Sequence, residues 1–414
     1  MNDYLDEIEK QLVELTERGP HRRVSVRRSE ALAILAAVAV AAAVVAIVVL
    51  NVGTATPRRA SAIGASGQAA STPGATVTTA PGPSLSSSAS TPALTQLPTS
   101  FAPQSFTAIS ELTWWLLGSQ PCSSGACPAI LRTTDGGPTF KAIQAPPGPL
   151  ATSVSGNVGY SQIRFADANN GFAYGPDLYV THDGGASWKP VAVGGRVGDL
   201  EISAGEAYAI VTDGAGTSGH LMRSPVDQDQ WAVVPAAGAV SGGLWVLGHE
   251  VIVQSGSDGP RPEVLVSQNG GEGFSRQPAP SPGLPCAFEA QSAQVIWAHC
   301  VTGTESGIWR SSDYITGFTP VHGAGLAPLP NSAAFGAASN TTAVVGDRQL
   351  YRTGDAGQTW TAVGPSGIAR WTYIGFSDAT HGVALGYAGS IAPQNEQLFY
   401  TTDAGQSYHL VPLP

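Results

Sequence analysis

An eight-residue pattern that returns at nearly constant intervals constrains the fold of this chain more than any other sequence feature. The clear copies are TTDGGPTF (133–140), THDGGASW (181–188), TGDAGQTW (353–360) and TTDAGQSY (401–408). The weaker copies are SQNGGEGF (267–274), SSDYITGF (311–318) and SPVDQDQW (224–231), the last of which keeps only the leading Ser and the closing Trp. Successive third positions are 42–48 residues apart, a period typical of propellers and solenoids.

The residues between the copies share one organisation. Residues 160–191 read YSQIRFADANNGFAYGPDLYVTHDGGASWKPV, and residues 371–387 read WTYIGFSDATHGVALGY. Each holds an alternating strand, a turn that opens with Asp and closes with Gly, and a second strand; a third strand enters the recurring pattern and a fourth leaves it. The seven periods predict an all-β fold, a seven-bladed β-propeller of four-stranded antiparallel blades over 106–414. Either the blades close in phase, or a segment around 98–103 adds an outer strand to the last blade.

The recurring pattern, Ser/Thr-x-Asp-x-Gly-x-Ser/Thr-aromatic, resembles the Asp box, also called the bacterial neuraminidase repeat. The neighbouring FADANNGFAYG (165–175) is similar to a pattern in propellers of the photosystem II assembly and stability factor and its bacterial relatives. The resemblance covers 106–414 and implies a β-propeller. Propellers of this type include sialidases, xyloglucan hydrolases, sorting receptors and assembly factors, so the resemblance alone does not select a function.

The residues of the pattern are expected to hold turns together. An Asp can accept hydrogen bonds from turn N–H groups, Gly supplies a positive φ, and the closing aromatic ring can pack between blades. The predicted structural residues are Asp135, Gly137, Phe140, Asp183, Gly185, Trp188, Trp231, Asn269, Gly271, Phe274, Asp313, Phe318, Asp355, Gly357, Trp360, Asp403, Gly405 and Tyr408. A catalytic residue would occur once, whereas this unit recurs around a ring. Each copy offers one carboxylate, too few for a good Ca²⁺ site, so no catalytic, cofactor or metal residue is predicted.

Outside the pattern, no constellation of catalytic residues stands out. A sialidase would need three clustered arginines and an Arg-Ile-Pro element; that element is absent, and Arg132, the nearest arginine, lies in a pattern strand. The other arginines are scattered: Arg164, Arg196, Arg223, Arg261, Arg276, Arg310, Arg348 and Arg370. A glycosidase needs two carboxylates facing one cleft. The candidates are interpreted as exposed acids of loops or strand faces: Asp199, Glu201, Glu206, Asp258, Glu289 and Glu305. GAGTSG (214–219) is interpreted as a hairpin loop, and His182 as an exposed turn residue.

The N-terminal part predicts a membrane anchor. Residues 31–50 lack any polar side chain, and at 1.5 Å per residue they would span a bilayer as a transmembrane signal-anchor helix within 30–51. The arginines at 22, 23, 27 and 28 place residues 1–29 in the cytoplasm and the propeller outside it; a cleaved signal peptide is the alternative. Residues 3–18 form an amphipathic helix that is either a solvated cap or a docking site for a cytoplasmic partner. Residues 52–105, rich in Ala, Ser, Thr, Pro and Gly, predict a disordered stalk.

Charge and cysteines narrow the environment. The formal net charge of −10 makes nucleic-acid binding unlikely, since little could neutralise a phosphate backbone. The cysteines fall into two close pairs, Cys122–Cys127 and Cys286–Cys300, which favour local disulfides in an oxidising compartment; buried free thiols are the alternative. Cys286 and Cys300 would face each other across a hairpin that turns near Ala293.

Two functions of different classes fit these features. The first is a non-catalytic binding or assembly module that recognises a protein, peptide or glycan on a propeller face. The second is a cell-surface carbohydrate-active enzyme, sialidase-like or another glycoside hydrolase. The missing arginine clamp and the want of paired carboxylates favour the first. A sensor that transmits binding to the cytoplasmic helix is a weaker third possibility.

Overall fold

The computed structural model describes residues 97–98, 100–123, 125–151, 158–213, 219–255, 263–280, 286–292, 295–302, 304–312, 317–389 and 395–414. All of them belong to the unit Ala55–Pro414. The cytoplasmic segment, the membrane anchor and nearly all of the expected stalk lie outside these residues, as do Asp258, Arg261 and Asp313. Within the described part, no helix is long and apolar enough to cross a membrane.

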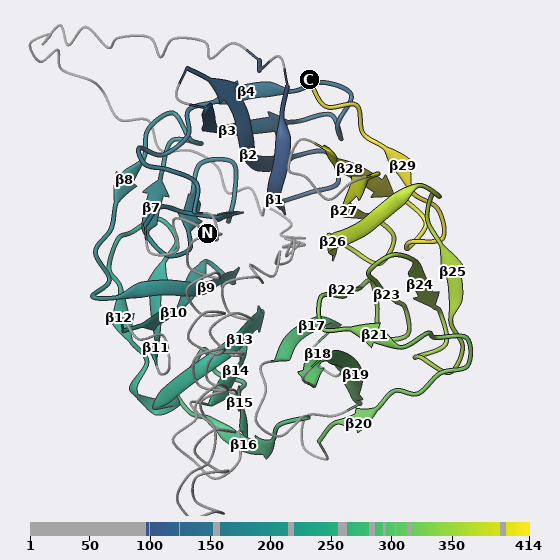
Figure 1. Ribbon diagram of the computed structural model, residues 1–414. Coiled ribbons are helices and arrows are strands. Elements are labelled where there is room, and N and C mark those ends of the chain that lie inside the picture. Colours follow the sequence, from purple (N-terminus) through teal and green to yellow (C-terminus); the bar gives the residue numbers. More distant parts are fainter. Residues whose placement is uncertain are drawn as a thin grey trace, which may run out of the picture. The chain divides into compact units, whose positions relative to one another are not determined.

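The described part is all-β and is built from antiparallel four-strand runs in chain order (Figure 1). The first run is β1 (Ala102–Ala108), β2 (Trp114–Cys122), β3 (Gly125–Thr133) and β4 (Lys141–Ile143). The next is β5 (Gln162–Phe165), β6 (Gly171–Tyr174), β7 (Leu178–Thr181) and β8 (Lys189–Pro190). Then come β9 (Arg196–Ser203), β10 (Glu206–Thr212), β11 (Gly219–Pro225) and β12 (Ala232–Val233).

A short 3-10 helix, Pro235–Ala237, leads to β13 (Ala239–Leu247), β14 (Glu250–Ser255), β15 (Glu263–Ser267) and β16 (Ser275–Pro278). This run is joined to the preceding one where β11 pairs with β13. The following run is β17 (Cys286–Ser292), β18 (Val295–Thr302), β19 (Glu305–Ser311) and β20 (Thr319–Pro320), with β21 (Leu329–Pro330) also paired to β19. The last two are β22 (Ala334–Ala337), β23 (Ala343–Gly346), β24 (Leu350–Thr353) and β25 (Thr361–Val363), and β26 (Ile368–Phe376), β27 (Gly382–Ala388), β28 (Glu396–Thr401) and β29 (His409–Leu410).

The runs surround a common centre, which is the arrangement of a β-propeller. In Figure 1 the first strand of each run lies nearest the centre and the fourth lies at the periphery. Contacts join β1, β5, β9, β13, β17, β22 and β26 in chain order. Some of these contacts are polar: the Ser105 hydroxyl accepts a hydrogen bond from the backbone N–H of Ile163 at 3.1 Å.

Each sheet packs between two neighbours, so its inner strands are largely buried on both faces, whereas outer strands such as β8 and β12 are exposed. The β6 sequence GFAY, the β23 sequence AVVG and the β5 sequence QIRF are buried at every position. Buried on both faces, such strands read as continuous apolar runs with little alternation. This explains why the period of the turns indicates the fold more clearly than the pattern of the strands.

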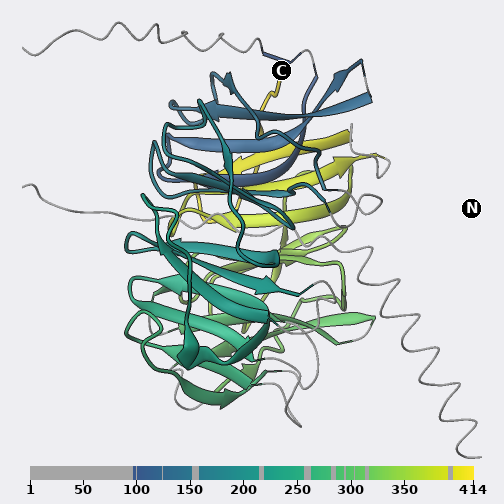
Figure 2. The ribbon, with the colours of Figure 1, turned by 90° about the vertical axis from the view of Figure 1, so that its left-hand side faces the viewer.

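The ring closes in phase. β29, the outer strand of the last sheet, consists of C-terminal residues, while Ala102 and Pro103 pair inside the first sheet with Ser119 and Gly118. Side-chain packing joins the two sheets: one buried cluster unites Phe106, Trp114 and Leu131 of the first with Tyr373, Leu385 and Leu398 of the last. Figure 2 shows these sheets, blue and yellow, next to each other from the side.

Two expectations are settled at this level. The first strand begins at Ala102, so the folded domain starts before residue 106 and takes in residues assigned to the stalk. Phe101 and Ser105 are buried. The strand was not expected from the sequence because Pro103 and the polar residues beside it are atypical of a buried strand. Both disulfides are confirmed: Cys122–Cys127 closes the hairpin of β2 and β3, and Cys286 pairs directly with Cys300 across β17 and β18.

Candidate functional site

The carboxylate of Asp183 accepts hydrogen bonds from within its own turn. The hydroxyl of Thr181 donates to Asp183 Oδ1 at 2.8 Å and accepts from the backbone N–H of Gly185 at 2.9 Å. The backbone N–H of Ser187 donates to Asp183 Oδ1 at 2.8 Å, and its hydroxyl donates to Oδ2 at 2.5 Å. The φ of Gly185 is 89°, and a Cβ there would lie 2.6 Å from the Ile143 side chain, so glycine is required.

The same bonds recur in other turns. Asp135, Asp355 and Asp403 each bind a hydroxyl two residues before and a hydroxyl four residues after. Asn269 keeps the bonds from Ser267 and from the N–H of Gly273. The Asn side chain has one acceptor oxygen where Asp has two. Gly273 stands where those Asp turns have a Ser or Thr hydroxyl, so this turn has no hydroxyl donor that would need a second acceptor oxygen. In the divergent copy, Ser224 instead bonds Gln228 and Gln230.

The closing aromatic rings pack into the core. Trp188, Trp360 and Tyr408 are buried, and Phe140, Phe274, Phe318 and Trp231 are partly buried against core clusters. Trp188 stands edge-on to Phe165 and donates its indole N–H to Gln144 O at 2.8 Å. The pattern residues lie in separate turns of separate sheets, so the structure does not bring them together into one site.

Hydrogen bonding lowers the pKa of the turn carboxylates. Bonds from Thr139 and Thr133 lower the pKa of Asp135 to about 2. Burial would raise the pKa of Asp403, but bonds from Ser407 and Thr401 outweigh it and bring that pKa to about 2. The same balance lowers the pKa of Asp183. Because these folded-state values lie below that of an unfolded Asp, the carboxylates contribute stability above about pH 4, and that contribution is lost as the pH falls towards about 2.

Replacing Asp183 with Ala is expected to lower the free energy of unfolding by about 1–2 kcal/mol, because Thr181, Ser187 and the turn N–H lose their acceptor. Asp183→Asn should cost less, since Asn269 holds the equivalent turn. Because Asn does not titrate, this variant should also lose less stability than the wild type when the pH falls below about 4. Urea denaturation at pH 7 and pH 3 measures both effects. Full stability of Asp183→Ala, combined with loss of a ligand-binding or catalytic activity, would contradict the structural role.

The expectation that the candidate acids are exposed is wrong for Asp199, Glu201 and Glu289, which are buried. Glu201 forms an ion pair with Arg164 at 3.3 Å, with both side chains buried. Asp199, also buried on β9, accepts the backbone N–H of Leu244 on the neighbouring β13 at 2.9 Å. Glu289 is buried on β17, while Glu206 and Glu305 begin β10 and β19. None of these acids lines either of the two cavities described below, and the described residues contain no cluster of three or more potential metal ligands.

Most of the scattered arginines are occupied by local partners. Arg223 pairs with Glu272, Arg276 with Glu263, and Arg310 donates to Asn340 O. His182 lies between Asn170 and Asp229, in a turn as expected. Arg348 and Arg370 line one cavity together.

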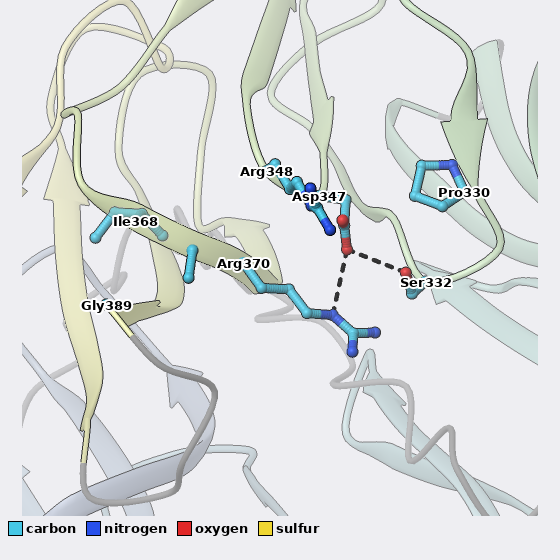
Figure 3. Close-up of a pocket in the computed structure, with 8 residues that line it drawn as sticks. Pro330, Ser332, Asp347, Arg348, Ile368, Arg370 and Gly389 are labelled. Carbon is cyan, nitrogen blue, oxygen red and sulfur yellow. Dashed lines mark hydrogen bonds and ion pairs between the residues drawn. The ribbon is translucent and has the colours of Figure 1, made fainter.

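That cavity, of about 700 Å³, is the candidate functional site (Figure 3). Its walls come from the segment before β22, the turn between β23 and β24, the start of β26 and the end of β27. The lining residues are Pro330, Ser332, Asp347, Arg348, Ile368, Ala369, Arg370 and Gly389. The cavity therefore opens where two neighbouring sheets meet, at the ends of the strands opposite the recurring turns.

Arg370 and Asp347 form the polar core of this site. Arg370 Nε lies 3.2 Å from Asp347 Oδ1, but its N–H is not aligned for a hydrogen bond, so we treat the contact as an ion pair. Ser332 donates to the same Oδ1 at 3.0 Å, and Asp347 O accepts the N–H of Trp371 at 2.5 Å. These bonds fix Asp347, whose carboxylate lies beside the Nε edge of the Arg370 guanidinium. Figure 3 shows the two terminal nitrogens of Arg370 directed away from Asp347.

Two further ionisable side chains, those of Arg348 and Glu396, lie in this part of the structure. Arg348 is exposed beside Asp347, and no ion pair or hydrogen bond to its side chain is found among the described residues. Across the last sheet, Arg370 pairs in register with Tyr387, and Tyr387 with Glu396. Burial raises the pKa of Glu396 to about 7, against a hydrogen bond from Thr372 that lowers it. Near neutral pH, Glu396 is therefore only partly ionised.

Sequence reasoning counted Arg348 and Arg370 among the scattered arginines and did not consider Asp347 or Ser332. The only local signal is the turn GDRQ (346–349), which places an acid and a base at a hairpin tip. Nothing in the sequence near it marks Arg370 as its partner, because that pairing depends on how two sheets pack.

No protein-family profile and no curated protein matches this sequence. Among solved structures, a puromycin-hydrolysing peptidase of Mycobacterium tuberculosis is 12% identical with a TM-score of 0.51, covering 77% of this chain and 56% of the peptidase. YCF48 bound to D1 peptide is 19% identical (TM-score 0.48; 75% and 95% covered). The β-propeller domain of the Trilobed protease from Pyrococcus furiosus is 8% identical (TM-score 0.45; 77% and 97% covered). At these identities the likeness concerns the fold alone, and the β-propeller arrangement rests on the ring of four-stranded sheets described above.

Proposed function

We propose that this protein is a non-catalytic binding or assembly module: a seven-bladed propeller, held outside the cytoplasm by the anchor at 31–50, that recognises an anionic group of a protein, peptide or glycan. The observation that carries the proposal is the guanidinium of Arg370. Its Nε forms an ion pair with Asp347, its terminal nitrogens point away from that acid, and the residue lines a cavity of about 700 Å³. A guanidinium held in this way can bind a carboxylate or phosphate with two parallel hydrogen bonds.

The rest of the cavity supports binding more than catalysis. It offers one carboxylate, Asp347, which is already paired, whereas glycoside hydrolysis uses two carboxylates facing one cleft. Ser332 is likewise bonded to Asp347 and has no neighbouring base within the cavity lining to activate it. Arg348 adds a second positive charge at the mouth.

The sequence supplies the cellular setting of the proposal. The pattern residues act as structural Asp-box turns, the two disulfides suit an oxidising compartment, and residues 52–100 serve as a stalk that holds the propeller away from the membrane. Residues 3–18 offer a helix for a cytoplasmic partner. In this arrangement the propeller selects the ligand, and the anchor only holds it at the membrane.

Arg370→Met should weaken binding of an anionic ligand by about tenfold or more, because a charge-assisted bidentate contact is worth about 1.5–3 kcal/mol. The purified full-length protein is titrated with a Glu-rich peptide, its Gln-rich counterpart and an oligogalacturonate, using calorimetry. At least one anionic probe should bind, and Arg348→Met should weaken it less. Arg276→Met is the control, since its exposed pair with Glu263 lies outside the cavity. Equal binding of the Glu and Gln peptides, or no binding by any anionic probe, would refute the proposal.

A further inference from the structure

We infer that a second groove, on the opposite face of the domain, binds an extended peptide segment that carries a basic side chain between apolar ones. The groove has a volume of about 470 Å³ and lies where the first and last sheets meet. It is formed by the β1–β2 and β3–β4 turns of the first sheet and by the β26–β27 turn and outer strands of the last. In an antiparallel sheet these turns lie at the other ends of the strands from the Arg370 cavity. The inference is therefore independent of the proposed function.

The groove gathers exposed apolar side chains. Leu112 is 50% exposed, Tyr400 38% and Leu410 52%, and all three line it. Only three other large apolar side chains are exposed in the described part of the chain, and none of them lines this groove. Phe106 and Trp114 form its buried floor. Apolar side chains gathered on a hollow, rather than scattered singly, mark an interaction site.

The charge of the groove selects the partner. The lining contains Glu111 and Asp135 and no Lys or Arg. The pKa of about 2 keeps Asp135 ionised, and the side chain of Glu111 is 55% exposed. His381 lies between two acids, with Nε2 3.3 Å from Glu111 and Nδ1 2.9 Å from Asp378. An apolar floor with an acidic rim complements a chain whose apolar residues flank a Lys or Arg.

The size and position of the groove favour a peptide. The apolar side chains come from both walls: Leu112 from the first sheet, and Tyr400 and Leu410 from adjacent strands of the last. An extended segment places alternate side chains on one side, so two apolar residues can reach Leu112 and Tyr400 while the residue between them turns to the rim. The groove thus suits a short linear segment of a partner protein.

The test uses two fluorescein-labelled nonapeptides with the same Leu, Phe and Leu positions, one with Lys and the other with Glu at the intervening positions. Anisotropy is measured on the full-length protein at low and high salt. The Lys peptide should bind at least tenfold more tightly than the Glu peptide, and salt should reduce the difference. Equal affinities, or no binding of the Lys peptide, would overturn the inference.

Variants locate the site. Glu111→Gln should weaken the Lys peptide several-fold, and Tyr400→Ser should weaken both peptides; both side chains are exposed, so circular dichroism should remain unchanged. Val233→Ser, which removes an apolar side chain that is 49% exposed on β12 and does not line the groove, is the matched control and should have no effect. Arg370→Met should also leave the Lys peptide unaffected, which separates this groove from the anionic-ligand site. If Val233→Ser weakens binding as much as Tyr400→Ser, or sedimentation shows that the groove instead pairs two copies of the chain, the inference fails.

Discussion

Replacing Arg164 with Met is expected to lower the free energy of unfolding by about 3–5 kcal/mol, the typical cost of removing one partner of a buried ion pair. Arg164 lies on the central strand β5 and is 1% exposed. Its guanidinium pairs with Glu201 on β9 at 3.3 Å and donates to Phe106 O on β1 at 3.5 Å, so it links three sheets. Met would remove these contacts and leave the carboxylate of Glu201 buried with one cation fewer.

Urea denaturation followed by tryptophan fluorescence measures the effect. The double variant Arg164→Met, Glu201→Leu should recover much of the loss, because no unmatched charge then remains. Arg276→Met is the control, since its pair with Glu263 is exposed and should be worth about 0.5 kcal/mol. If Arg164→Met lowers the free energy of unfolding by less than about 1 kcal/mol, the contacts of this arginine do not hold the three sheets together.

Trp115→Ala should cost about 3–5 kcal/mol, because it removes a fully buried ring and leaves a cavity between the first and second sheets. The ring stacks on Phe165 of the second sheet, with centroids 4.0 Å apart and planes 3° from parallel. Arg132 lies over the ring at 5.0 Å. Trp115→Phe should retain part of the stacking and cost less.

The same denaturation experiment distinguishes this packing from a general effect of losing an aromatic residue. Tyr400→Ala removes a ring that is 38% exposed and should change stability by less than about 1 kcal/mol. If the two variants lose similar stability, the contact between Trp115 and Phe165 does not hold the two sheets together.

Local chemistry explains what could be predicted from the sequence. The turn pattern needs a hydroxyl, an acceptor and a glycine at fixed spacing, so residues such as Thr181, Asp183 and Gly185 reveal it without knowledge of the fold. The same applies to Cys286 and Cys300, which the register of one hairpin brings together. The start of the domain was less visible, because β1 includes Pro103 and several polar residues.

The candidate sites could not be predicted in this way. Asp347 and Arg370 lie on neighbouring sheets, and Glu111 and His381 lie on the first and last sheets of the ring. Their contacts depend on the packing angle between sheets and on ring closure, which no local pattern encodes. A repeated pattern therefore predicts the sheets and turns well, and the residues that meet between neighbouring sheets poorly.

Because each sheet is built from consecutive strands, the chain could begin and end at another point of the ring without changing which strands form each sheet. Phe101 and Leu413 pack into the same core cluster, so the two ends of the described domain are neighbours. A short linker between them, with a new opening in the loop between the second and third sheets, would give a circular permutant in which every sheet keeps its own strands. The chain that precedes the domain would then join it at a different point on the rim, without altering either the cavity at Arg370 or the groove at Leu112.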